Sequence, residues 1–122
     1  MSSLVHRTLV AGLLIVASGL ACAAGTGFTP STAQIGALEK ALPLPKGAYP
    51  LGEYARFYAG QVVNGRHLIY LRLMRGFETT PGIKIVDPAR LPGAEDGGCS
   101  VIAGSYEIES GTFKNVACNG DA

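Results

Sequence analysis

The spacing of apolar residues changes from a helical to an extended period along the chain. Early in the sequence, apolar residues recur at intervals of three and four, at Ile35, Leu38 and Leu42. Ser31 and Gln34 have the form of a capping box at the start of this stripe, and Pro43 ends it. The pattern predicts one short helix, ending at about residue 42, that packs by a single face.

A strand-like pattern follows the helix. Residues 53–63 and 66–75 are rich in β-branched, aromatic and leucine residues, and Asn64-Gly65 between them is typical of a two-residue hairpin turn. Pairing across this turn places Tyr58 opposite Leu71. We therefore expect an antiparallel hairpin whose strands meet at Asn64-Gly65.

This hairpin is predicted to be apolar on both faces. One face collects Tyr58, Val62, Ile69, Leu71 and Leu73. The other collects Phe57, Ala59, Leu68, Tyr70 and Met74, with Arg72 among them. We expect one face to pack on the helix and the other to be partly covered by a loop or by a partner chain.

Residues 76–98 contain several prolines and are expected to be irregular, apart from a short strand at Ile83–Val86. A second hairpin is expected after them, over residues 101–107 and 112–118. The predicted fold class is therefore α+β, with one N-terminal helix packed on an antiparallel sheet of about four strands that form two hairpins.

The first residues have the composition of an export signal. His6 and Arg7 precede the uncharged apolar run 9–20, and Ala21-Cys22-Ala23 has the small-x-small form of a cleavage site. The apolar run is shorter than the about 20 residues that a membrane-spanning helix needs. We expect residues 1–23 to be a cleaved signal peptide, with no membrane span left after cleavage.

Cys22 leaves an alternative open. A cysteine just after an apolar run, preceded by a small residue, is also the lipid-modified position of bacterial lipoproteins. The protein is thus expected to be secreted or periplasmic, with a lipid anchor through Cys22 as the alternative. Residues 24–30 are expected to be a flexible leader, and residues 31–122 a single small domain.

The other two cysteines are expected to form a disulfide. Cys99 and Cys118 are an even pair in a chain that carries an export signal. Pairing Glu107 with Thr112 places Cys118 opposite Val101, one diagonal step from Cys99, so a bulge is expected near the open end of the second hairpin. By the chain-entropy model, closing this loop stabilises the fold by about 3 kcal/mol.

Charge and residue content exclude several function classes. The chain has 10 basic and 9 acidic residues, and Arg7 leaves with the signal, so the mature protein is neutral and nucleic-acid binding is not expected. No phosphate- or dinucleotide-binding motif is present, and no cofactor is expected. One mature histidine, His67, with both cysteines in a disulfide, makes a metal site improbable.

Catalytic constellations are weak. A triad of His67 with Ser100 or Ser105 and an acid has no support in spacing. Glu95 and Asp96 stand beside two glycines and are expected to be turn residues. We expect no catalytic site and no enzyme activity; the hydrolase hypothesis would require His67 in a pocket beside a nucleophile.

One motif stands out. Gln61, Val62, Val63, Asn64 and Gly65 fit Q-x-V-x-G, and this segment resembles the first inhibitory loop of cystatins, at a hairpin tip that follows a helix. The segment from Cys99 to the end of the chain is similar to the disulfide-closed terminal hairpin of secreted cystatins, and the element order over residues 31–122 is similar too. The chain departs from the family in having no tryptophan for the second loop and no second disulfide.

The resemblance implies a wedge that plugs the cleft of a papain-like cysteine protease. The backbone of Gln61–Gly65 and the leader near Gly25 and Gly27 would make the contacts, by shape and apolar burial rather than by charge. The leading functional hypothesis is thus a non-catalytic binding or inhibitory module. The alternative is a structural or envelope-associated protein that assembles with other components or with itself through the first hairpin.

Overall fold

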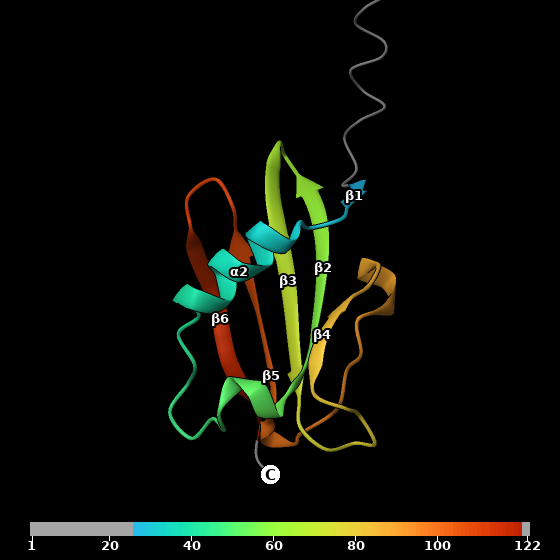
Figure 1. The fold of residues 1–122 in the computed structure, drawn as a ribbon, viewed down its shortest axis with the longest axis vertical. Helices are drawn as coiled ribbons and strands as arrows, with labels where there is room; N and C mark the ends of the chain where they lie inside the picture. The colour runs from blue at the N-terminus through green and yellow to red at the C-terminus, as the bar shows by residue number, and fades with distance from the viewer. Residues whose placement is uncertain (1–25, 121–122) are drawn as a thin grey trace, which may run out of the picture.

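The computed structural model describes residues 26–120 (Figure 1). The expected signal peptide, its cleavage site and Cys22 lie outside the described residues. In chain order the elements are β1 (Thr26–Phe28), α2 (Thr32–Ala41), a 3-10 turn (Leu51–Glu53), β2 (Ala55–Val63), β3 (Arg66–Met74), β4 (Gly82–Ile85), a second 3-10 turn (Pro88–Arg90), β5 (Gly98–Glu107) and β6 (Thr112–Asn119).

The strands form one sheet in the order β1-β2-β3-β5-β6, with β4 also paired to β2. β1 and β4 share one edge of β2. β1 runs antiparallel to the second half of β2, with Phe28 opposite Gly60, whereas β4 runs parallel to the first half, with Ile85 opposite Tyr58. The helix lies across one face of this sheet (Figure 1).

The expectation of about four strands is wrong, because the sheet has six strands within residues 26–120. The two hairpins supply four of them, and the additional strands are β1, inside the expected leader, and β4, which is the short strand expected at Ile83–Val86 but not counted in the expected sheet. Both are very short. They become strands because the edge of β2 offers unpaired N–H and C=O groups along its whole length.

The predicted register of the first hairpin is confirmed. Tyr58 lies opposite Leu71, and Val63 lies opposite Arg66. Asn64 and Gly65 have φ values of 51° and 78°. Two positive φ values in a two-residue loop are the geometry of a type I′ turn, which asparagine and glycine adopt at low cost.

The second hairpin is also confirmed at its turn, where Glu107 lies opposite Thr112. Cys118 lies opposite Ile102 and not Val101, because the register shifts between Ala103 and Ser105. A second shift, between Gly98 and Ile102, lies near the open end, where a bulge is expected. The Cys99–Cys118 disulfide is present, with a Cα–Cα distance of 4.5 Å.

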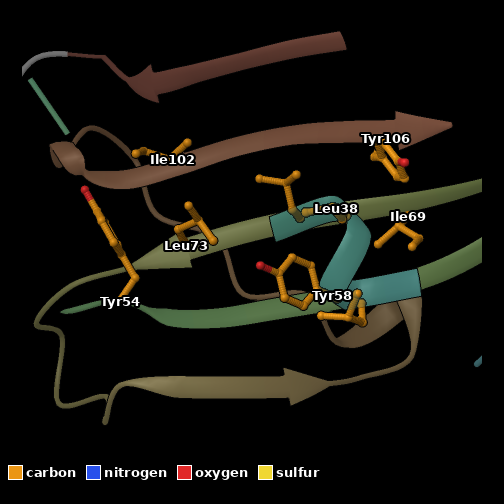
Figure 2. Packing of buried hydrophobic residues seen from close by; sticks show 9 residues of the cluster. Leu38, Tyr54, Tyr58, Ile69, Leu73, Ile102 and Tyr106 are labelled. Carbon is orange, nitrogen blue, oxygen red and sulfur yellow. The ribbon is translucent and has the colours of Figure 1, made fainter. Parts of the chain in front are cut away.

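Helix α2 begins and packs as the sequence indicates. The amide of Gln34 donates to the Ser31 hydroxyl at 3.0 Å, and the amide of Ser31 donates to the Gln34 side chain at 2.8 Å, which completes the capping box. Ile35 and Leu38 are buried against the sheet. Figure 2 shows Leu38 in one layer with side chains from the strands; the buried core is Ile35, Leu38, Tyr54, Tyr58, Ile69, Leu71, Leu73, Ile102 and Tyr106.

A polar cluster also holds the helix to β2. Glu39 of α2 accepts hydrogen bonds from the Tyr58 hydroxyl at 2.6 Å and from Arg56 Nε at 2.7 Å. Burial, together with the neighbouring Glu39 carboxylate, raises the pKa of Tyr58 far above its ordinary value. Tyr58 therefore stays neutral and serves as a buried donor.

The opposite face of the sheet is partly covered by residues 86–97, which we call the connector. Arg72 of β3 donates from Nη1 to the carbonyl of Pro92 at 2.7 Å. Asn119 of β6 donates to the carbonyl of Asp96 at 2.8 Å. These bonds place the connector against the second face, as expected for a loop that covers it.

Candidate functional site

The residues of the Q-x-V-x-G segment lie at the end of the sheet where β2 turns into β3, which we call the turn end. Gln61 and Val63 are the last part of β2, and Asn64 and Gly65 are exposed at the tip. A Cβ atom added at Gly65 would meet no other atom within 4 Å. The tip therefore projects from the domain with nothing packed on its outer side.

The leader strand β1 lies beside this tip. Thr26 pairs with Val62, so the chain enters the described structure next to the loop. The ring of Phe28 lies over Gly60, where an added Cβ would come within 2.5 Å of the Phe28 carbonyl oxygen. The same ring meets His67 edge-on, with centroids 5.0 Å apart. Only glycine at position 60 leaves room for this contact.

The tip of the second hairpin lies on the other side of β3. The amide of Ile108 donates to the carbonyl of His67 at 2.9 Å. Glu109 accepts a bond from the amide of His67 at 2.8 Å, and its other oxygen lies 2.5 Å from Nδ1 of the same histidine. Both oxygens of one carboxylate thus connect the two hairpins at their tips.

An ion pair supports the same arrangement. Arg66, the first residue of β3, pairs with Glu107, the last residue of β5. Hydrogen bonding from Ser110, and then from Arg66, lowers the pKa of Glu107. The hydrogen bonds from His67 lower the pKa of Glu109 to about 2. Both carboxylates are therefore ionised at neutral pH, and each of them connects the two hairpins at the turn end.

The structure does not assemble the triad that the sequence allowed one to draw. Ser105 pairs with Tyr70 and so belongs to the connector face, whereas His67 pairs with Val62 on the helix face. Ser100 accepts a bond from the amide of Arg75, at the opposite end of β3 from His67. His67 has a carboxylate partner but neither serine beside it.

The acidic residues near the glycines are placed as turn residues. Asp96 has a φ of 62° and is exposed, and its carbonyl accepts the bond from Asn119. Glu95 is exposed beside it. Within residues 26–120, no group of three or more metal-ligating side chains is gathered.

Sequence reasoning missed two residues of the turn end. Phe28 lies inside the expected flexible leader, and the sequence indicates it only as a large apolar residue between a small and a polar one. Glu109 lies in the turn between the expected strands 101–107 and 112–118. Its position beside His67 can be inferred only when the sheet order is known, because the β5–β6 turn lies level with His67 only if β5 pairs with β3.

Comparisons with known proteins do not assign the chain to a family. No family model, no curated protein and no solved structure matches it. In the described part of the chain, no helix is both long and apolar enough to cross a membrane. The Cys99–Cys118 disulfide fits a protein that works outside the reducing cytosol.

Proposed function

We propose that this protein is a non-catalytic binding module that engages a protein partner with its turn end, in the manner of a cystatin-like wedge. The partner class is a papain-like cysteine protease, and the place of action is outside the cell or in the periplasm. The Gln61–Gly65 loop enters the cleft, and the leader strand β1 and the β5–β6 tip contact its two sides.

One observation carries this proposal. Three segments that are far apart in sequence lie side by side at one end of the sheet: β1, the β2–β3 tip and the β5–β6 tip. Figure 1 shows both hairpin tips and β1 at the same end of the molecule. A row of three projecting segments has the shape that a narrow cleft can accept.

Contacts within the domain also hold the row together before any partner arrives. Phe28 packs against His67, and Glu109 accepts bonds from the amide and ring of the same residue. A site whose loops are already ordered loses less conformational entropy on binding, and more of the contact energy then appears as affinity.

The second tip is the weaker part of the proposed surface. It presents Glu109 and Ser110, both exposed, in place of a large aromatic residue. Loss of an aromatic anchor from the centre of an interface commonly costs about 2 kcal/mol, or about thirtyfold in affinity. We therefore expect inhibition that rests mainly on Gln61–Gly65 and on the leader.

The test is a titration of the purified protein against papain, with activity measured on a small chromogenic substrate. Gly65→Trp places a bulky side chain at the tip and should weaken inhibition at least about tenfold. Gln61→Ala should weaken it less, because the backbone of the loop remains.

Gly76→Trp is the matched control. Gly76 also has a positive φ, of 93°, and open space around its Cβ direction, but it lies after β3, away from the turn end. The Gly76→Trp variant should inhibit papain as strongly as the unaltered protein does. Absence of inhibition at high micromolar concentration, or equal losses from Gly65→Trp and Gly76→Trp, would reject the proposed role of the turn end.

A further inference from the structure

Strand β4 has a free outer edge with its backbone groups available. The amides of Gly82 and Val86 donate to the carbonyls of Tyr54 and Tyr58, at 3.1 and 2.9 Å. Because alternate residues of a strand direct their amides to opposite sides, Ile83 and Ile85 direct theirs away from β2. Within residues 26–120, no strand pairs with that side of β4; Figure 1 shows β4 at the margin of the sheet.

The side chains of the same two residues line an apolar groove. Ile83 and Ile85 are 48% and 42% exposed, which is unusual for isoleucines on a strand. They pair with Arg56 and Tyr58 and so belong to the helix face. The groove between β4 and the start of α2 has a volume of about 220 Å³ and is lined by Pro30, Thr32, Ile35, Gly36, Ile83 and Ile85.

Charge restricts what can pair with this edge. Lys84 lies between the two isoleucines and belongs to the opposite face, level with Phe57. Its ammonium group donates a hydrogen bond to Thr80 Oγ1 at 3.4 Å. Among the described residues, no carboxylate forms an ion pair with it. An acidic side chain on an added strand would supply the missing partner.

The same lysine disfavours a second copy of this chain. Two β4 strands paired antiparallel through Ile83 and Ile85 would place Lys84 directly opposite Lys84 of the other copy. Like charges directly opposite in a sheet are destabilising, and lysine on an edge strand is a common protection against self-pairing. The charge of Lys84 thus disfavours pairing of β4 with a second β4 and favours pairing with an acidic strand.

We infer that β4 is a second binding site, distinct from the turn end, which takes an extended peptide of the pattern apolar–acidic–apolar as an added antiparallel strand. The peptide exchanges main-chain hydrogen bonds with Ile83 and Ile85, and its two apolar side chains enter the groove beside α2. Its acidic residue lies opposite Lys84, at the position of a non-hydrogen-bonded pair, where cross-strand side chains are closest.

The test uses the purified protein labelled with ¹⁵N and the peptide acetyl-Thr-Val-Glu-Val-Thr-amide. Titration should shift the amide resonances of β4 and of the start of α2, and leave those of Asn64 and Gly65 unchanged. A control peptide with lysine in place of glutamate should bind about tenfold more weakly. Equal binding of the two peptides, or shifts at the turn end instead, would overturn the inference.

Two variants separate charge from backbone pairing. Lys84→Glu should reverse the preference, so that the lysine peptide binds better. Ile83→Pro removes an amide that points to solvent, a place where edge strands tolerate proline, and should weaken binding about tenfold or more.

Ile83→Thr is the matched control for the backbone, since it keeps the amide and the β-branched shape; it should bind better than Ile83→Pro. If Ile83→Pro does not fold, the peptide preference of Lys84→Glu still tests the inference. If Lys84→Glu does not reverse that preference, the acidic strand is rejected as the occupant. Gly65→Trp should leave peptide binding unchanged, so the result is independent of the proposed function.

Discussion

On one face of the sheet, α2 contributes Ile35 and Leu38 to a core in which the buried side chains are all apolar or aromatic. On the other face, the connector lies over the sheet through hydrogen bonds from Arg72 and Asn119, and Arg72 Nε is buried with no hydrogen-bond partner among residues 26–120. The hydrogen-bonding groups of the helix backbone pair within the helix, so the helix packs on the sheet by apolar side chains. The carbonyls of Pro92 and Asp96 in the connector instead accept hydrogen bonds from side chains of the sheet.

The difference has an energetic consequence. The larger apolar cluster lies on the helix face and contributes to stability in proportion to its buried area. The connector face buries Met74 and Val101 as well, but each hydrogen bond to the connector contributes little net free energy, since water competes for the same groups. We expect the helix face to determine global stability and the connector face to determine local order. The following variants test this contrast.

The largest effect is expected from Leu38→Ala. Leu38 is fully buried between α2 and the sheet, and truncation there leaves a cavity. The free energy of unfolding should fall by about 2–5 kcal/mol, measured by urea denaturation. The exposed neighbour Lys40 provides the control, and Lys40→Ala should change stability by less than about 0.5 kcal/mol. A loss below about 1 kcal/mol for Leu38→Ala would contradict a helix-based core.

Gly60→Ala should have the next largest effect. Its Cβ would come within 2.5 Å of the Phe28 carbonyl and 2.8 Å of the Phe28 ring, so β1 must move. We expect a loss of about 1–3 kcal/mol and faster hydrogen exchange in β1.

Gly36→Ala is the matched substitution for Gly60→Ala. Gly36 lies in α2 with no atom within 4 Å of an added Cβ, and alanine there should stabilise the protein by up to about 1 kcal/mol. Equal effects of the two substitutions would show that Phe28 does not lie over Gly60 in solution.

Arg72→Met tests the connector face. The variant keeps an unbranched side chain of related length, loses the bond to Pro92 and removes the buried unpaired Nε. The loss and the gain oppose each other, so the free energy of unfolding should change by less than about 1 kcal/mol. Hydrogen exchange in residues 88–97 should become faster while that of β3 stays slow. A loss above about 3 kcal/mol would make Arg72 part of the global core.

The smallest effect is expected at the exposed turn end, and it depends on pH. The pKa of Glu109 is lowered from 4.5 to about 2 by the bonds from His67, so the ionised form favours the folded state. Its contribution is present above about pH 4.5 and is lost as pH falls through about 2.

Glu109→Gln removes this contribution. The melting temperature of Glu109→Gln should lie below that of the unaltered protein at pH 6, and the gap should close toward pH 2. A gap of constant size from pH 6 to pH 2 would show that the carboxylate charge has no part in connecting the hairpins.

Much of the site followed from local rules. Asn64 and Gly65 require a particular turn, and that turn sets the register of β2 against β3. The position of Glu109 beside His67 did not follow, because no local rule states that β5 pairs with β3. The order of strands depends on which apolar faces can share one core, and that is a property of the whole chain.

The sequence by itself determined the helix and its cap, both hairpins with their turns, and the disulfide pair, because each rests on residues close in sequence or on a count of cysteines. The tertiary structure alone decided that β1 is a strand, that β4 pairs parallel to β2, that the connector covers Arg72, and that three distant segments meet at the turn end. Short segments without periodicity gain structure only from the partner they pair with. Here that partner is the edge of β2 opposite β3.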